Sequence, residues 1–265
     1  MTGAAASPRE RRPLLAGNWK MHLVRAEAEA LIAELAAALA PWAAAADVAV
    51  FPSHPLLAPV ASALAGTPIE LGAQDLHPQS QGAHTGDVAA AQLVDAGCRW
   101  VICGHSERRR DHGETDALVA AKARAALAAG LAPVVCVGET RDERHSGRTF
   151  EVLARQLAEL PADPRVVVAY EPVWAIGTGE TATPEVAADA HAYLRDRVAR
   201  SAGAPFARRL RILYGGSVTP GSAPELAARP EIDGFLVGGA SLDATRFLAI
   251  LDAFAPPGAV LRGQP

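Results

Sequence analysis

The sequence has little cysteine and no long apolar run. Its 265 residues include three cysteines, Cys98, Cys103 and Cys136, in apolar stretches without the spacing of metal ligands. A small, odd number of cysteines disfavours a disulfide framework, so we expect buried, reduced thiols. No apolar run approaches the roughly 20 residues that cross a bilayer, and the first dozen residues lack the apolar stretch of a secretory signal. We therefore expect a cytoplasmic protein with no membrane partner.

The sequence also lacks an excess of positive charge, because its formal net charge is -4 at pH 7. A nucleic-acid-binding protein needs a clustered basic face, so we expect no nucleic-acid partner. Lysine is scarce too, since Lys20 and Lys122 are the only lysines among 25 basic residues. Arginine supplies the ordinary charge elsewhere, so the two lysines indicate positions that need a compact, mobile ammonium group.

What the sequence does contain is a regular alternation. Short apolar and β-branched runs alternate with alanine-rich segments of helical periodicity, and no linker divides them, which fits one domain. The predicted strands are 14–18, 48–51, 69–73, 100–103, 134–138, 166–170, 211–214 and 234–237. Predicted helices between them include 25–40, 116–129 and 184–201.

Strict alternation of strand and helix predicts an α/β fold with a parallel sheet, because parallel neighbours need crossover connections. Eight units favour a closed (β/α)8 barrel, eight parallel strands surrounded by helices, over an open doubly wound sheet. No glycine-rich dinucleotide fingerprint follows the first strand, as an open sheet of that kind often has. We predict the barrel over residues 13–256, with a flexible extension at 1–12 and a tail at 257–265.

Polar and glycine-rich segments directly follow five of the predicted strands. They are GNWKMH, CGHSERR, YEPVWAIGTGE, YGGSV and VGGASL, after the first, fourth, sixth, seventh and eighth strands. The carboxyl ends of barrel strands meet at one rim, where the active sites of such barrels lie, so we expect one shared site. Taken singly, His105 can be a structural histidine, Asn18 a turn cap and Lys20 a solvated charge, and glycine pairs are common in turns.

These segments resemble the signature segments of triosephosphate isomerases. AGNWKM, GHSERR, AYEPVWAIGTG, YGGSV and GFLVGGASL occur in the order and spacing of that family, over about residues 13–255. The resemblance implies a TIM barrel that interconverts dihydroxyacetone phosphate and D-glyceraldehyde 3-phosphate, a small phosphorylated sugar pair. It also implies a homodimer, no cofactor, no metal, and a place in glycolysis and gluconeogenesis.

Such an isomerase needs a base and a group that polarises a carbonyl. Glu171 fits the base, because a carboxylate partly stripped of water becomes more basic. His105 fits the polariser, and the family precedent is a neutral imidazole near the amino end of a helix. A general base contributes only roughly 10²- to 10⁴-fold, so Lys20 and Asn18 are candidates for stabilising charge on the substrate oxygens.

Backbone amides are expected to bind much of the substrate phosphate, because glycines let the main chain approach an anion closely. The resemblance assigns this role to Gly177, Ser217, Gly238 and Gly239. The segment 172–179, with a proline at one end and glycines at the other, is expected to be a flap that closes and excludes water.

The resemblance implies supporting positions around this catalytic set. Ser106 is expected to hold Glu171 while the flap is open, and Glu107 to support the site. Thr85, in the long loop after the third strand, is expected to enter the active site of the partner subunit. Further supporting positions that match the family are Arg109, Glu114 and Cys136.

Several residues depart from the family's usual pattern and leave dimer strength and phosphate affinity open. They are His22, Asp75, His84, Asp111 and Glu180. An isomerase of a four-carbon ketose phosphate on the same scaffold remains an alternative, although the intact AIGTG segment favours the three-carbon substrate.

A non-catalytic sugar-phosphate-binding homologue is the other alternative, and it would be expected to lose Glu171, His105 or Lys20. Ser106 and Ser217 lack the nucleophile-elbow context of a hydrolase. The eight histidines show no paired spacing of metal ligands, which disfavours a metalloenzyme.

Overall fold

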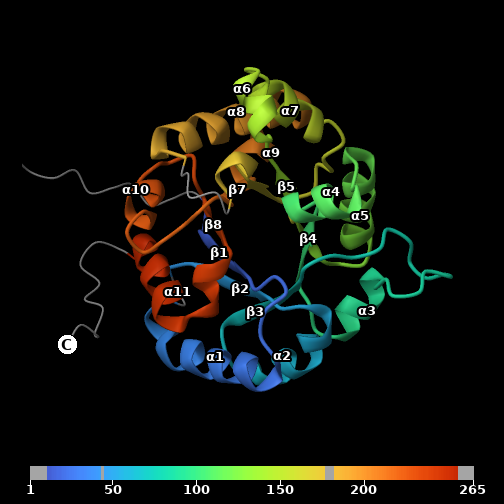
Figure 1. The fold of residues 1–265 in the computed structure, drawn as a ribbon, viewed down its shortest axis with the longest axis vertical. Coiled ribbons are helices and arrows are strands. Elements are labelled where there is room, and N and C mark those ends of the chain that lie inside the picture. The colour runs from blue at the N-terminus through green and yellow to red at the C-terminus, as the bar shows by residue number, and fades with distance from the viewer. Residues whose placement is uncertain (1–10, 43–44, 177–181, 256–265) are drawn as a thin grey trace, which may run out of the picture.

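The computed structural model describes residues 11–42, 45–176 and 182–255, and these form a closed barrel of parallel strands with helices outside it (Figure 1). The strands neighbour one another in chain order, and the last pairs with the first. They are β1 (Leu14–Asn18), β2 (Asp47–Phe51), β3 (Ile69–Ala73), β4 (Trp100–Cys103), β5 (Ala132–Val137), β6 (Val167–Tyr170), β7 (Arg211–Tyr214) and β8 (Gly234–Val237). The predicted barrel is confirmed.

The helices form a ring around the strands (Figure 1). They are α1 (Arg25–Ala38), α2 (Leu57–Ala63), α3 (Ala90–Asp95), α4 (Ser106–His112), α5 (Asp116–Ala128), α6 (Arg141–His145), α7 (Thr149–Gln156), α8 (Pro184–Ala202), α9 (Ala204–Arg209), α10 (Ala223–Ala227) and α11 (Ala244–Leu251). α1 ends two residues before the predicted boundary and is followed by a 3-10 turn, Ala40–Trp42. Pro41 in that turn has no N–H to donate back to the helix.

Side chains of the strands alternate between two apolar clusters. Leu14 and Ala16 belong to a cluster made of strand residues alone, which fills the barrel, whereas Leu15 belongs to the cluster shared with the helices. Successive side chains of a strand point to opposite faces, so each strand contributes to both cores. Side-chain packing therefore stabilises the closed barrel in addition to the hydrogen bonds between its strands. The ends of the strands keep fixed positions relative to one another.

β5 begins two residues earlier and ends one residue earlier than predicted. It ends before Gly138 because the side chain of Gln156 takes over the hydrogen bonds of that glycine, accepting its N–H at 2.7 Å and donating to its carbonyl at 3.1 Å. A Cβ at Gly138 would lie 1.7 Å from the carbonyl oxygen of Glu171. Glycine here lets the ends of β5 and β6 approach closely, which positions Glu171.

Charged residues fasten the amino ends of the strands. Arg11 pairs with Asp233 at 2.6 Å, and Asp233 also accepts from Arg195 at 2.6 Å. Arg12 donates to Asp47 at 2.5 Å. Arg11 and Arg12 thus lie against the barrel, while residues 1–10 of the expected extension and the expected tail lie outside the described residues.

All three cysteines are buried and unpaired, as predicted. Burial raises the pKa of Cys98 to about 12, so its thiol stays protonated and unreactive at neutral pH. Within the described ranges, no helix is both long and apolar enough to cross a bilayer.

Candidate active site

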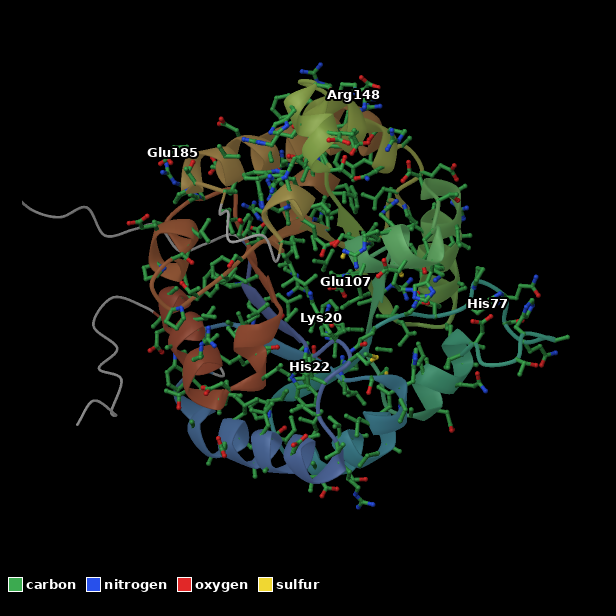
Figure 2. All side chains as sticks on the ribbon, viewed as in Figure 1. Lys20, His22, His77, Glu107, Arg148 and Glu185 are labelled. Carbon is green, nitrogen blue, oxygen red and sulfur yellow. The ribbon has the colours of Figure 1, made fainter. Side chains whose placement is uncertain are left out.

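A cavity of about 640 Å³ lies at the carboxyl ends of the strands, and all five segments identified in the sequence contribute to its lining. Figure 2 shows Lys20 and Glu107 near the centre of the view, inside the ring of helices. The predicted residues that line this cavity are Asn18, Lys20, His105, Glu107, Glu171, Ser217, Gly238 and Gly239. Residues that are distant in sequence therefore share one cavity.

Glu171 and His105 form a buried pair at this cavity. Oε1 of Glu171 lies 2.9 Å from Nε2 of His105, and Oε2 accepts the backbone N–H of Ser106 at 2.9 Å. Glu171 is only 2% exposed, and a Cβ at Gly215 would lie 3.0 Å from its Cγ, so the glycine after β7 makes room for the carboxylate. Each carboxylate oxygen thus has one donor and keeps a further lone pair with which it can accept a proton from a ligand.

The local backbone fixes which nitrogen of His105 carries a proton. His105 is the N-cap of α4, and its Nδ1 accepts the N–H of Glu107 at 3.2 Å. A neutral ring therefore carries its proton on Nε2 and donates it to Glu171. The Nε2–H group therefore points at the Glu171 carboxylate. A ligand oxygen that takes the place of this carboxylate would accept the same hydrogen bond.

The charges of the pair stabilise each other. Burial lowers the pKa of His105, but the adjacent Glu171 carboxylate raises it, and the pKa lies above its usual value in this arrangement. Burial raises the pKa of Glu171, yet His105, the Ser106 N–H and Lys20 together hold it below its usual value. Glu171 is therefore ionised at neutral pH. A ligand that separates the pair removes the effect of the carboxylate on His105, and burial then favours the neutral imidazole.

Lys20 lies in a turn that its neighbours hold in place. Its φ of 52° is uncommon for a residue other than glycine. Its N–H donates to Oδ1 of Asn18 at 3.1 Å and its carbonyl accepts from Gln74 at 2.8 Å, while Nζ lies 2.6 Å from Oε1 of Glu107. Because the amide oxygen of Asn18 serves the turn, its amide nitrogen is the group that can donate to a ligand.

The glycines after β8 bring bare backbone to the same cavity. A Cβ at Gly238 would lie 3.9 Å from Nζ of Lys20, whereas a Cβ at Gly239 would meet nothing within 4 Å. The main chain thus passes close to the ammonium group and then borders open space, as an anion site requires. Ser217 lines the cavity as well, and Gly177 lies outside the described residues.

The segment predicted as a flap is described from Pro172 to Ile176, and the rest of it lies outside the described residues. Nε1 of Trp174 donates to Glu139 at 2.8 Å, and the hydroxyl of Tyr170 donates to the same carboxylate at 3.1 Å. The fully buried Glu139 therefore anchors the amino end of the segment. Sequence reasoning missed Glu139, whose only signal was a carboxylate just after a buried strand.

Arg109 supports the loop that carries His105. Its guanidinium donates to the carbonyls of Gly104 at 2.9 Å and Cys136 at 3.1 Å, and to Asp116 at 2.6 Å. These bonds tie the end of β4 to β5 and α5.

A buried ion cluster outside this cavity contains the second lysine. Nζ of Lys122 lies 2.6 Å from Asp75 and 2.5 Å from Glu114, and Arg108 pairs with both carboxylates at 2.8 and 2.5 Å. Burial raises the pKa of Asp75 despite Lys122, whereas Lys122 and Arg108 overcome the effect of burial and lower the pKa of Glu114. A compact ammonium fits this position, but it is fixed by its partners and is not mobile.

The segment between β3 and α3 projects from the barrel, and Figure 2 shows His77 on it, away from the cavity (Figures 1 and 2). It includes Thr85, which does not line the cavity. His77 and His84 stack 3.9 Å apart, and with Asp87 they offer three potential ligand atoms within 4.8 Å. Their sequence spacing gave no sign of this cluster. Both imidazoles are already bonded to Gln79, so they hold the loop itself together.

Two cations in the cavity lining were not among the predicted site residues. Arg110 follows GHSERR and pairs with Asp111 at 2.6 and 2.7 Å. Arg246 lies in the first turn of α11 with an exposed side chain. A single arginine on an amphipathic helix is usually a solvated surface charge, so the sequence pattern did not indicate that Arg246 lines the cavity.

The comparisons with known proteins agree with this geometry. The family model described as triosephosphate isomerase matches residues 13–254. Relatives with that name include one from Granulibacter bethesdensis, 52% identical over 249 residues that cover 92% of this chain and 100% of that protein. The one from Chloroflexus aurantiacus is 50% identical over 91% of this chain and 98% of that protein, and the one from Bordetella pertussis is 53% identical over 92% and 98%.

Proposed function

The chain belongs to the triosephosphate isomerase family and is an isomerase, and from that premise we propose that it interconverts dihydroxyacetone phosphate and D-glyceraldehyde 3-phosphate through an enediolate. The observation that carries this proposal is that Glu171, His105 and Lys20 line one cavity. A carboxylate, an imidazole N–H and an ammonium group are suited to proton transfer next to a carbonyl. The reaction moves a proton and electron pairs within one substrate, so it needs no cofactor or metal.

The proton transfer begins at Glu171. Its carboxylate takes a proton from the carbon next to the carbonyl, the C–H electron pair becomes the enediolate double bond, and negative charge moves to the carbonyl oxygen. Nε2 of His105 gives its proton to that oxygen and takes the hydroxyl proton from the oxygen on the adjacent carbon, and the same carboxyl group then returns the first proton to the neighbouring carbon. To reach the substrate, Glu171 exchanges its hydrogen bonds to His105 and Ser106 for contact with the ligand.

His105 and Lys20 stabilise the charge that this transfer creates. The Nε2–H of His105 turns from the carboxylate to the two substrate oxygens, where it donates as a neutral imidazole. Lys20 places its positive charge beside the enediolate, and the Asn18 amide nitrogen donates a further hydrogen bond. Preorganised donors and charges of this kind act on the developing charge without having to reorganise during the reaction.

The phosphate binds at the glycine-bearing backbone in this proposal. The amides of Ser217, Gly238, Gly239 and Gly177 hold its oxygens, and Lys20 lies close enough to Gly238 to share the charge. The segment 172–179 closes over the bound substrate and excludes water. The anchoring of Trp174 at Glu139 supports a fixed amino end for that movement.

The protein forms a homodimer in the cytoplasm in this proposal and serves glycolysis and gluconeogenesis. The projecting loop with Thr85 would enter a cavity of about 470 Å³ on a second copy, lined by Met21, Asp75 and His112 and bordering Lys20 and His105. Met21 is 93% exposed, which supports coverage by a partner. Light scattering at micromolar concentration is expected to give twice the chain mass, and a single-chain mass would contradict the dimer.

Turnover of the two triose phosphates by the purified protein tests the proposed reaction. We expect isomerisation in both directions, and much slower turnover of a tetrulose phosphate. Faster turnover of the four-carbon substrate would assign the scaffold to that alternative, and no turnover of either would support a non-catalytic protein.

A further inference from the structure

Arg246 differs from the other two cations in the cavity lining. Lys20 pairs with Glu107 at 2.6 Å, and Arg110 pairs with Asp111 at 2.6 Å. Within the described part of the chain, the side chain of Arg246 forms neither an ion pair nor a hydrogen bond. Its charge is therefore the least neutralised positive charge at the cavity.

The position of Arg246 is on the side of the cavity that holds the glycine-bearing backbone. It belongs to the first turn of α11, four residues after the 3-10 turn η4 (Gly239–Leu242) ends, and both segments line the same cavity. Backbone groups of η4 are placed to meet a phosphate, because Gly239 has no side chain and the buried hydroxyl of Ser241 donates to the Gly238 carbonyl at 2.7 Å. Arg246 is thus the nearest cation in the sequence to this part of the lining.

The negative charge of the protein and of its cavity makes an unpaired cation important for attracting an anionic substrate. The protein carries a net charge of -4, and the carboxylates of Glu107 and Glu171 line the cavity, so an incoming dianion meets negative charge overall and two carboxylates at the site. An unpaired positive charge at the mouth offsets that repulsion and concentrates the anion there. Lys20 and Arg110 do this less well, because a carboxylate accompanies each of them.

We propose that Arg246 is a substrate-capture residue, which attracts and holds the phosphate dianion of the substrate at the outer part of the cavity. This inference rests on the proposed isomerase function and adds a side chain to phosphate recognition that no sequence motif indicates. Asp243 opposes the effect, because its carboxylate caps α11 by accepting the Arg246 backbone N–H at 2.8 Å. The carboxylate is engaged with the backbone and does not pair with the guanidinium.

The variant Arg246→Gln tests this role against substrates with and without a phosphate. We expect kcat/KM for D-glyceraldehyde 3-phosphate to fall about 3- to 10-fold at low ionic strength, mainly through KM, because an exposed charge acts modestly and is screened by salt. The inhibition constant of inorganic phosphate is expected to rise by a similar factor. Turnover of unphosphorylated D-glyceraldehyde is expected to stay unchanged, and Arg246→Lys to restore most of the loss.

Arg209→Gln is the matched control, because it removes the same charge from an exposed arginine next to the amino end of β7. It is expected to leave both constants unchanged. If the wild type isomerises triose phosphate but Arg246→Gln keeps its kcat/KM and its phosphate inhibition, the capture role is wrong. An equal loss with D-glyceraldehyde would also overturn it, since that points to a structural effect. Absence of isomerisation in the wild type would instead contradict the proposed function.

Discussion

The two ends of the barrel use charged residues in opposite ways. At the amino ends of the strands, Asp233 accepts from Arg11, from Arg195 and from the N–H of Ile212. At the carboxyl ends, Glu171 and Lys20 are also paired, but they border a cavity of about 640 Å³. At the amino ends, the carboxylate has all its partners within the protein. At the carboxyl ends, a ligand in the cavity can separate the paired groups.

An ion pair between a lysine and a carboxylate therefore does not by itself identify a functional site. Lys122 and Lys20 illustrate this, because both pair with carboxylates at 2.5 to 2.6 Å. Only Lys20 lines the cavity with His105 and Glu171. The same chemistry supports the fold in one place and is available for catalysis in the other.

Breaking the amino-end network is expected to produce the largest change in stability. Asp233→Ala leaves Arg11 and Arg195 without their carboxylate, and Asp233 is only 3% exposed. We expect the free energy of unfolding to fall by about 3 to 5 kcal/mol in urea titrations, because one partner of a buried pair is removed. The kcat of the molecules that stay folded is expected to change little.

Asp196→Ala serves as the control for this variant. Asp196 pairs with Arg200 on the exposed surface of α8 at 2.9 Å. Exposed pairs contribute about 0 to 1 kcal/mol, so a small loss is expected. Equal losses from Asp233→Ala and Asp196→Ala would remove the distinction between the ends of the barrel.

Removing the charge at the carboxyl end is expected to affect activity instead. Lys20→Met should lower kcat/KM roughly 10²- to 10³-fold, the cost of losing one preorganised group that stabilises transition-state charge. Lys122→Met is the contrasting variant, because it leaves Asp75 and Glu114 short of a partner and is expected to lower stability. Steady-state kinetics and urea unfolding of both variants separate the two effects. The contrast fails if Lys122→Met reduces kcat of the folded protein as much as Lys20→Met does.

The smallest expected effect is a displaced pH profile. The pKa of His105 is raised above its usual value while Glu171 is beside it, so lowering the pH protonates the pair earlier than an isolated histidine. kcat/KM, which reports the unliganded protein, should therefore fall toward acid at a higher pH than kcat, which reports the complex. The substrate phosphate also titrates near pH 6, so His105→Gln is needed as a reference that retains only that limb. If kcat and kcat/KM of the wild type fall toward acid at the same pH, the proposed separation of Glu171 from His105 by the substrate is contradicted.

Much of the fold could be predicted from the sequence because each strand is a short apolar run between helical segments. The predicted limits of β1, β3, β4, β7 and β8 match the structure. The predicted end of β5 was wrong because the side chain of Gln156, 18 residues away, takes the hydrogen bonds of Gly138. A local pattern carries no information about that side chain.

The candidate site could be predicted to the same extent and for a related reason. Barrel topology brings the strand ends together, so the presence of Lys20, His105 and Glu171 in one cavity followed from their place in the repeat. Topology does not show which side chains pair or point inward. Glu139, Arg246 and the partners of Lys122 were therefore visible only in three dimensions.

The role of Glu171 as the base is tested by the exchange of the carbon-bound proton of dihydroxyacetone phosphate with solvent deuterium, followed by NMR for the wild type and Glu171→Asp. Shortening the side chain by one methylene moves the carboxylate away from the substrate carbon while keeping its charge. We expect exchange in the wild type and a rate about 10²-fold slower in the variant, in line with the contribution of a positioned general base. An unchanged exchange rate in Glu171→Asp would contradict this role.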